Sequence, residues 1–344
     1  MHGAKVFAKI DLKEAYTQLM LDEESRKMTN FHTDEGIFRY KRLIYGINNA
    51  FEIFQRAMEQ SFGKMTGVKF ISDDIIISAQ HELQLIERLR TVFIKIRELG
   101  TKINLSKCVF FAKKLKYYGV EISENGTNAD PDKVKAIKDA ERPRNVKELR
   151  SFLGLCTYVS RYIENFSEKT ATLRTLLKAN QKFIWTEEHE IAFMNLKNEM
   201  SSEKVLAFYD PSKPVKLVTD ASGHALCGIL LQEESPGDYR PIHYISRSLK
   251  PAEMNYSPIE KEALALVWGI EKLHLYLYAK HFEVISDHKP LQYIFAPRAK
   301  LNSRIARWQI QLQAYDFNVT YEEGSKNIAP FLDRKSAIFL LPSK

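Results

Sequence analysis

The first third of the chain has a hydrophobic pattern that predicts a β-α-β-β-α-β unit of about 120 residues. Apolar positions alternate over residues 6–12, a strand that ends on Asp11. Residues 49–62 and 81–100 each place apolar side chains on one face of a helix, and the first helix ends at Gly63. These faces consist of Phe51, Phe54, Ala57, Met58 and Phe62 in the first helix and of Leu85, Leu89, Val92, Phe93 and Ile96 in the second. Residues 35–44 are typical of a hairpin around Gly36, residues 68–79 of two short strands, and residues 103–111 and 115–123 are strand-like.

The pattern then becomes helical, and later alternates again. Helices are expected at residues 131–140, 146–166 and 187–200. After Pro214, strands are expected at residues 215–222, 225–232, 243–249, 281–287 and 317–324. Ser257 and Glu260 form a capping box that opens a helix reaching Leu277, and residues 303–315 form another helix. These elements follow one another as three strands, a helix, a strand, a helix and a strand. This is the order of an α/β unit of ordinary domain size.

Two adjacent aspartates, Asp73 and Asp74, interrupt an otherwise apolar β-run, FISDDIIIS, at residues 70–78. Burying one carboxylate without a partner is costly, and a second one beside it adds like-charge repulsion. A fold does not place such a pair for stability. The residues alone therefore favour a functional role for this pair, at the turn between two short strands.

Carboxylates recur at predicted strand ends in both parts of the chain. Asp11 closes a strand that can converge with the paired aspartates, whereas Asp220 and Asp287 end later strands and Glu262 lies one turn into the helix between them. Clustered carboxylates suit two-metal phosphoryl transfer, because Mg²⁺ takes oxygen ligands and offsets their repulsion. Taken singly, each strand-end aspartate is more often a turn residue or helix cap, and Glu262 can simply favour the helix dipole.

Composition narrows the class of protein only partly. The chain has 344 residues, 44% hydrophobic and 27% charged, which predicts a soluble protein of two or three domains. Neither a membrane-spanning run nor a signal-peptide layout is evident, so an intracellular protein is expected. The three cysteines indicate no disulfide framework or zinc site. The net charge of +8 suits a polyanion such as nucleic acid, but many solvated enzymes carry a similar charge.

Two ordered series of motifs resemble the Pol polyprotein of gypsy-type LTR retrotransposons. Its reverse transcriptase is similar to FAKIDLKEAYTQL, TNFHTDEGIFRYKRLIYGINNAFEIFQRAM, FISDDIIIS and CVFFAKKLKYYGVEIS. Its RNase H domain is similar to LVTDASGHALCGILLQ, RSLKPAEMNYSPIEKEALALVWG and ISDHKPL. The resemblance implies an α+β reverse transcriptase palm with a helical thumb, followed by an α/β RNase H-like domain with a five-stranded mixed sheet. The implied boundaries are 1–126 for the palm, 127–210 for the thumb and connection, 211–335 for the RNase H-like domain and 336–344 for a tail.

The resemblance also implies a polymerase site. Asp11, Asp73 and Asp74 match the palm aspartates that bind two Mg²⁺ ions. Tyr16 matches the aromatic residue under the incoming sugar, although it otherwise reads as a core aromatic. Tyr45 and Gly46 match the segment that frames the nucleotide pocket. The primer grip matches Tyr117, Tyr118 and Gly119. The basic helices from 133 to 178 resemble a thumb that follows the duplex through phosphate contacts.

In the RNase H-like part, three of four family carboxylates fall on Asp220, Glu262 and Asp287. The fourth is expected near residue 330, where this chain has Pro330. Asp333 is the nearest carboxylate, on a similar helix face but almost one turn further along. It is the remaining candidate for the fourth ligand.

Two other positions depart from the family pattern. Ile71 stands where the family carries the tyrosine of Tyr-x-Asp-Asp, and Phe51 replaces a proline at the start of the following helix. Because Asp11 comes so early, most of the fingers subdomain, the protease and the integrase are expected to lie outside this chain.

The function implied is an RNA-directed DNA polymerase with RNase H activity. Its partners would be an RNA template, a DNA primer, an RNA–DNA hybrid and dNTPs, with Mg²⁺ as cofactor and Mn²⁺ as the alternative. A second hypothesis is a catalytically compromised transposon remnant that folds and binds nucleic acid only, and a third is a cellular nuclease that uses only the RNase H half. A cytoplasmic virus-like particle and the nucleus are both compatible locations, and pairing with another Pol subunit stays open.

Overall fold

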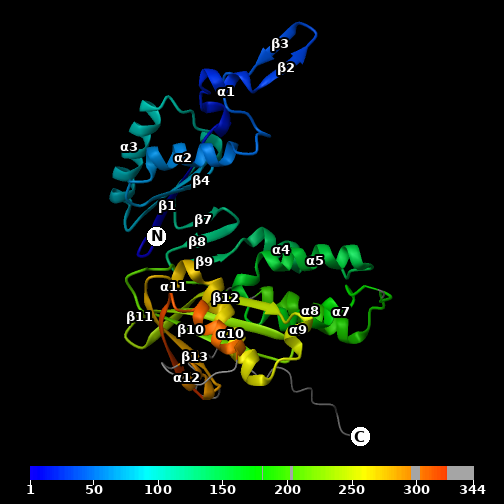
Figure 1. Ribbon diagram of the computed structural model, residues 1–344. Helices are drawn as coiled ribbons and strands as arrows, with labels where there is room; N and C mark the ends of the chain where they lie inside the picture. Colours follow the sequence, from blue (N-terminus) through cyan, green and yellow to red (C-terminus); the bar gives the residue numbers. More distant parts are fainter. Residues whose placement is uncertain (180, 202–203, 296–302, 324–344) are drawn as a thin grey trace. The chain divides into compact units, whose positions relative to one another are not determined.

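The computed structural model describes residues 1–179, 181–201, 204–295 and 303–323 (Figure 1). The chain divides into two compact units, Met1–Asp130 and Pro131–Lys344. The helices between residues 131 and 201 fall in the same unit as the sheet that follows them. The predicted domain boundaries after residues 126, 210 and 335 stay predictions.

The first unit contains the expected β-α-β-β-α-β order as β1, α2, β4, β5, α3 and β6. Its helices are α1 (Glu23–Lys27), α2 (Ala50–Phe62) and α3 (Glu82–Glu98), with 3-10 turns η1 (Ala15–Gln18) and η2 (Leu105–Lys107). Its strands are β1 (Val6–Asp11), β2 (Asn30–Thr33), β3 (Gly36–Arg39), β4 (Val68–Ile71), β5 (Asp74–Ala79), β6 (Val109–Ala112), β7 (Lys114–Tyr117), β8 (Val120–Ser123) and β9 (Gly126–Ala129). The main sheet is antiparallel with the order β4-β5-β1-β6.

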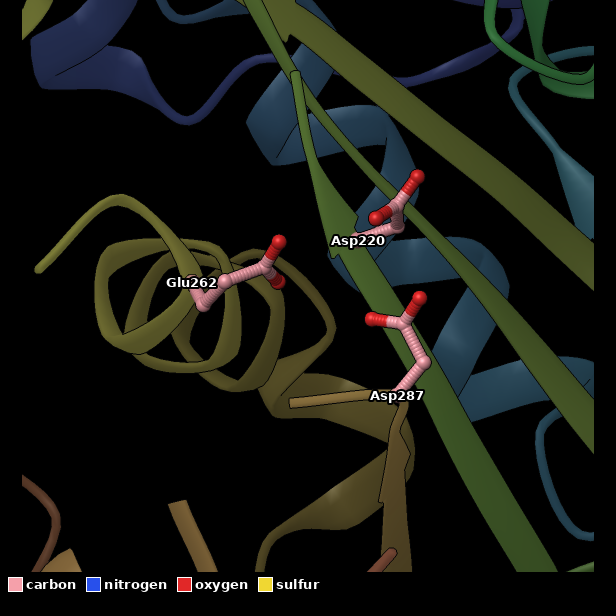
Figure 2. A group of neighbouring side chains, drawn as sticks. All are labelled: Asp220, Glu262 and Asp287. Atoms are coloured by element: carbon pink, nitrogen blue, oxygen red, sulfur yellow. The ribbon is translucent and has the colours of Figure 1, made fainter. Parts of the chain in front are cut away.

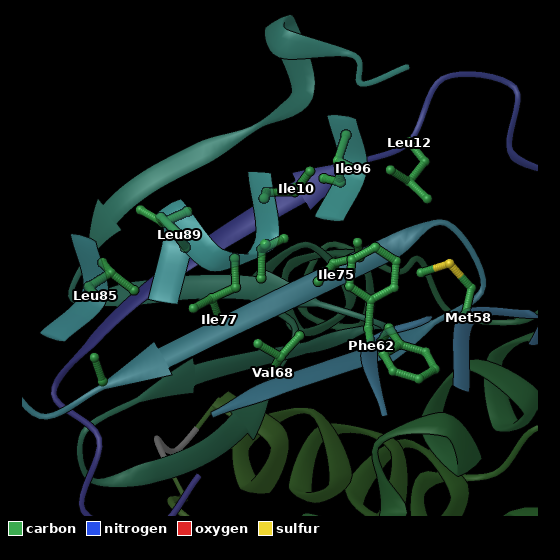
Figure 3. Packing of buried hydrophobic residues seen from close by; sticks show 14 of the residues in the cluster. Ile10, Leu12, Met58, Phe62, Val68, Ile75, Ile77, Leu85, Leu89 and Ile96 are labelled. Atoms are coloured by element: carbon green, nitrogen blue, oxygen red, sulfur yellow. The ribbon is translucent and has the colours of Figure 1, made fainter. Parts of the chain in front are cut away.

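One face of this sheet packs against α2 and α3 to form the core of the unit (Figure 3). Every second residue of β1 and β5 takes part, as Ile10 and Ile75 do, together with Phe62 from α2 and Leu89 from α3. Because side chains alternate between the two faces of a strand, the residues between them point to the other face. The carboxylates that end β1 and begin β5 therefore project away from the helices.

Three expectations for this unit were wrong in detail. Phe51 was placed on the buried face of α2, but it stands in the first turn of the helix and is 48% exposed. The segment 103–111 is a strand only from Val109, because η2 occupies its middle. The hairpin expected around Gly36 is confirmed as β2 paired with β3, but within residues 35–44 the hairpin strand is only Gly36–Arg39.

The second unit combines helices with a longer sheet. Its helices are α4 (Pro131–Lys138), α5 (Val146–Tyr158), α6 (Phe166–Lys169), α7 (Ala171–Thr175), α8 (Glu187–Ser201), α9 (Pro251–Met254), α10 (Pro258–Lys272), α11 (His274–Leu277), α12 (Pro290–Ile294) and α13 (Ser303–Gln311), with the 3-10 turn η3 (Ser160–Tyr162). Its strands are β10 (Val215–Ala221), β11 (Ala225–Ser235), β12 (Asp238–Ser248), β13 (His281–Ser286) and β14 (Asp316–Tyr321).

Two of the predicted helices in this unit are broken. The helix expected over 146–166 ends at Tyr158, and the chain continues through η3 to Asn165, whose φ of 49° is left-handed. The apolar residues of this stretch are buried, and η3 and α6 contact β12. The helix expected to reach Leu277 ends at Lys272, and α11 follows it as a separate turn.

The sheet of the second unit has the order β12-β11-β10-β13-β14. The first three strands pair in antiparallel fashion, whereas β13 runs parallel to both β10 and β14, so the predicted five-stranded mixed sheet is confirmed. Helix α10 opens with the predicted capping box and buries Ala263, Leu266 and Ile270 in the core over this sheet. No helix in the described part of the chain is long and apolar enough to cross a membrane.

Candidate functional site

The paired aspartates lie at a tight hairpin turn, as the sequence predicts. Ile71 and Asp74 face each other at the ends of β4 and β5, so the turn consists of Ser72 and Asp73. On the other side, Asp74 is directly opposite Asp11 in the antiparallel pairing of β1 with β5. The fold thus brings residues more than sixty positions apart in the sequence to one end of the sheet.

The backbone of this turn is held at three successive residues. The N–H of Ser72 donates to Oε1 of Gln55 in α2 at 3.1 Å. The carbonyl of Asp73 accepts from the N–H of Leu12 at 3.0 Å, and the carbonyl of Asp74 accepts from the Tyr117 hydroxyl at 3.3 Å. Hydrogen bonds to buried backbone groups define their positions, so the turn is fixed from α2, β1 and β7.

The electrostatic environment of Asp11 is unfavourable for its charge. This residue is only 8% exposed, and burial raises the pKa of its carboxyl above the ordinary value. The nearby carboxylates of Asp74 and Asp73 raise this pKa further, whereas Lys107 acts in the opposite direction. The Nζ of Lys9 lies 3.0 Å from a carboxylate oxygen of Asp74 and offsets part of the negative charge. Such a group of like charges is a feature of sites that bind cations.

The residues predicted to surround the nucleotide also lie together. The Tyr16 ring is 4.8 Å from the Tyr45 ring and 5.4 Å from the Phe54 ring, measured between centroids. Burial and then the nearby Asp73 carboxylate raise the pKa of Tyr45, which nevertheless keeps an exposed face. Gly46 has a φ of 90°, and a Cβ placed there would meet no atom within 4 Å. The glycine is therefore required by the backbone conformation and not by crowding.

The predicted primer-grip residues separate into two environments. Tyr117 ends β7 and is 6% exposed, whereas Tyr118 is 65% exposed. Tyr118 and Gly119 have φ values of 45° and 77°, the combination of a two-residue type I′ turn between β7 and β8. Tyr118 is therefore presented to solvent at the tip of a hairpin, and Tyr117 points inward.

The second predicted carboxylate group converges closely. Figure 2 shows the side chains of Asp220, Glu262 and Asp287 pointing toward one another from β10, α10 and the end of β13. One carboxylate oxygen from each lies within 4.8 Å of the others. Among the residues that the structure describes, this is the one such group of three. Glu262 is buried, and the other two are partly exposed.

Local structure explains this convergence. Strands β10 and β13 are parallel neighbours, with Val218 paired to Ile285, and continuing that register places Asp220 level with Asp287. Carboxyl ends of parallel neighbours meet at one edge of the sheet. The capping box at Ser257 starts α10 at a fixed residue, so Glu262 enters from the first turns of the helix. Burial and then the Asp220 carboxylate raise the pKa of Cys227, the residue opposite Asp220 in β11.

Two predicted positions cannot be placed in this geometry. Asp333, the predicted replacement for the fourth carboxylate, and Pro330 lie outside the described residues. The sequence also gave no sign of the pairing of Lys9 with Asp74, or of the proximity of Lys107 to Asp11. Both lysines could be found only once β1 had been placed beside β5 and β6.

Two family models match the chain in succession. Residues 1–122 match the reverse transcriptase (RNA-dependent DNA polymerase) family, and residues 210–315 match the RNase H-like domain found in reverse transcriptase. The same order is expected from the motifs.

Relatives of known classification are retrotransposon polyproteins. The retrovirus-related Pol polyprotein from transposon 412 of Drosophila melanogaster is 35% identical over 334 residues, covering 96% of this chain. The corresponding protein from transposon gypsy is 34% identical over 351 residues, and the transposon Tf2-3 polyprotein of Schizosaccharomyces pombe is 33% identical over 340 residues. The chain spans 27%, 33% and 26% of the length of these three relatives.

Solved structures confirm the expected fold class. The foamy viral protease-reverse transcriptase in complex with an RNA/DNA hybrid superimposes with a TM-score of 0.80 at 22% identity, covering 98% of this chain and 47% of that one. The foamy viral protease-reverse transcriptase in complex with dsDNA gives a TM-score of 0.79 at 23% identity, covering 93% of this chain and 68% of that one. The fold is that of a reverse transcriptase followed by an RNase H-like domain.

Proposed function

The chain belongs to the reverse transcriptase and RNase H region of gypsy-type retrotransposon Pol polyproteins, and from that premise we propose that it carries both activities. It extends a DNA primer with dNTPs on an RNA or DNA template, and it cuts the RNA strand of an RNA–DNA hybrid. The observation that carries the proposal is the presence of two separate carboxylate groups, one in each of the matched domains.

The candidate ligands fit a hard divalent cation. All six are carboxylates, which are oxygen donors that suit Mg²⁺ or Mn²⁺ and not softer metals. The triad in the second unit brings three such oxygens within 4.8 Å of one another, and these residues would hold the nuclease metals. In the first unit, Asp11 and the two turn aspartates would hold the polymerase metals, and the Lys9 ammonium already lies beside one of them. Bound Mg²⁺ ions supply Lewis-acid stabilisation of the attacking and leaving oxygens of phosphoryl transfer.

The remaining polymerase residues position the reactants. Tyr16 and Tyr45 form an aromatic wall near Asp73, where a ring beside the incoming sugar crowds a 2′-hydroxyl and so favours dNTPs. Tyr118, at the exposed tip of the β7–β8 hairpin, contacts the primer end. Helices α4 and α5 carry basic residues that contact the phosphates of the duplex, which hold its register without reading its sequence.

Primer extension tests the polymerase half. The full chain is incubated with poly(rA), an oligo(dT) primer, dTTP and Mg²⁺. The double variant Asp73→Asn/Asp74→Asn is expected to lower the rate of primer extension by more than about 100-fold, which exceeds the effect of removing a residue that only supports a metal ligand. Asp238→Asn, at the exposed first residue of β12, removes the same kind of charge from a residue outside the six candidate ligands and serves as the control. Extension that persists in the double variant would show that the site is assigned to the wrong residues.

Hybrid cleavage tests the nuclease half independently. Glu262→Gln is expected to abolish cleavage of the RNA strand and to leave primer extension intact, because the two groups lie in different units. A wild-type chain that shifts an RNA–DNA hybrid in a gel but neither extends nor cuts it would instead establish the binding-only remnant.

A further inference from the structure

Tyr117 differs from the other predicted primer-grip residues because its hydroxyl is already engaged. The side chain is buried, and the hydroxyl donates to the carbonyl of Asp74 across 3.3 Å. The neighbouring Tyr118 is exposed at the hairpin tip. Because Tyr117 is buried and Tyr118 is exposed in the turn, only Tyr118 is available to contact a primer.

The hydroxyl is not needed to fill space. A phenylalanine would bury the same ring, and it would leave no polar atom to satisfy. The geometry makes this hydroxyl the hydrogen-bond donor, because a carbonyl oxygen can only accept. The contacts of this hydroxyl with the β4–β5 hairpin, the hydrogen bond to the Asp74 carbonyl and the interaction with the backbone of Ile71, are therefore what distinguish tyrosine from phenylalanine at this position.

The contact joins two turns. Tyr117 is the last residue of β7, next to the left-handed pair Tyr118 and Gly119, and Asp74 is the first residue after the Ser72–Asp73 turn. The path from the exposed hairpin tip to the paired aspartates is thus one peptide bond, one side chain and one hydrogen bond.

We propose that Tyr117 is a positioning residue that couples the primer end, held at the β7–β8 tip, to the carboxylates of the Asp73–Asp74 turn. The inference rests on the proposed polymerase function. A primer seated on Tyr118 fixes the tip, the Tyr117 hydroxyl holds the Asp74 carbonyl, and the carboxylates keep the spacing that a cation needs. Tyr117 acts through Asp74 and does not itself touch the primer.

Tyr117→Phe tests the coupling because it removes only the hydroxyl. Single-nucleotide addition by the full chain is expected to slow by about threefold to tenfold, the effect of one hydrogen bond, while the dissociation constant for primer–template is unchanged. Mn²⁺ binding, measured by calorimetry in a Glu262→Gln background that weakens the nuclease group, is expected to weaken by a similar factor. Tyr118→Ala is expected to show the reverse, with weaker primer–template binding.

Tyr209→Phe is the matched control. The Tyr209 hydroxyl donates to the carbonyl of Tyr276 at 2.7 Å in the second unit, so this variant loses the same kind of hydrogen bond. It is expected to lower the melting temperature of its unit and to leave nucleotide addition and Mn²⁺ binding unchanged. A general loss of stability would affect both variants, whereas the coupling affects Tyr117→Phe alone.

Three results would overturn the inference: an unchanged rate and Mn²⁺ affinity in Tyr117→Phe, weaker primer binding with an unchanged rate, or an equal loss of rate in Tyr209→Phe. If the wild-type chain extends no primer, the proposed polymerase function fails. The comparison of Mn²⁺ affinities then tests the coupling through Tyr117 by itself, and equal Mn²⁺ affinities of wild type and Tyr117→Phe would refute it.

Discussion

Asp11→Asn is expected to stabilise the first unit in the absence of metal while it abolishes primer extension. The substitution keeps the shape of the side chain and removes its charge. Asp11 is buried, directly opposite Asp74 and close to Asp73, and its pKa is raised by burial first and by these two carboxylates in addition. The ionised form is therefore less favourable in the folded chain than in the unfolded chain.

The size of the effect follows from the pairing. Like charges directly opposite each other in antiparallel strands cost about 0.2–1 kcal/mol, and each unit of pKa shift corresponds to about 1.4 kcal/mol. The lost attraction to Lys107 offsets part of the gain. We expect a net stabilisation of about 1 kcal/mol. This corresponds to about fivefold slower hydrogen exchange of the amides that open with the first unit.

The stabilisation depends on pH in a defined direction. The unfolded carboxyl loses its proton near the ordinary value of 3.8, and the folded one loses it at higher pH. The penalty is absent below 3.8, grows between 3.8 and the raised folded-state pKa, and is complete above that pKa. The advantage of Asp11→Asn is thus full at neutral pH and shrinks as the pH is lowered through this interval.

Hydrogen exchange with peptide-resolved mass spectrometry measures this effect where it arises. Peptides from β1 and β5 report the first unit, and all three tryptophans, Trp185, Trp268 and Trp308, lie in the second unit. Tryptophan fluorescence therefore serves as an internal control that is expected to stay constant. Mg²⁺ at about ten times its dissociation constant is expected to add about 1.4 kcal/mol to the stability of wild type and much less to that of Asp11→Asn. With Mg²⁺ bound, wild type is therefore expected to be the more stable of the two.

Faster exchange in β1 and β5 of metal-free Asp11→Asn at neutral pH would refute this reasoning. It would mean that the carboxylate contributes more through its contacts, including the attraction to Lys107, than its burial and its carboxylate neighbours cost. An advantage that persists unchanged below pH 3.8 would equally show that charge is not its origin.

Two other residues near the turn give further predictions. Ser72→Gly is expected to stabilise the β4–β5 hairpin by about 0.5–1 kcal/mol, because the cost of a left-handed backbone exceeds the entropy cost of glycine. Ser72 has such a backbone, with a φ of 54°. Slower hydrogen exchange in β4 and β5 would confirm this prediction, and faster exchange would contradict it. Lys9→Met is expected to lower the Mg²⁺ concentration needed for half-maximal primer extension by about twofold to fivefold, because the ammonium beside Asp74 repels the metal. If the variant needs more Mg²⁺, the role of Lys9 is instead to orient the Asp74 carboxylate.

The residue pattern predicts the elements that depend on local signals. The turn at the paired aspartates, the capping box at Ser257 and the succession of strands and main helices along the second unit follow from alternation, capping and turn chemistry, and the structure confirms them. The convergence of Asp220, Glu262 and Asp287 was predictable because each stands at a defined end of an element.

Features that depend on distant partners were not predictable. The pattern could not show that Phe51 lies beside the buried face of α2, which includes the preceding Ala50, or that the chain after Tyr158 leaves its helix to pack η3 and α6 against β12. It could not distinguish Tyr117 from Tyr118, because the difference is made by a hydrogen bond to Asp74. The pairing of Lys9 with Asp74 likewise joins residues 65 positions apart.

The two-residue turn between β4 and β5 determines which changes a lineage of such elements can tolerate. Side chains alternate with a period of two, so an insertion or deletion of one residue in β5 would turn Asp74 to the helix-covered face. A substitution at Ile71 leaves the pairing of position 71 with Asp74 and of Asp74 with Asp11 in place. The position of the carboxylates therefore depends more on the length of this hairpin than on the identity of residue 71.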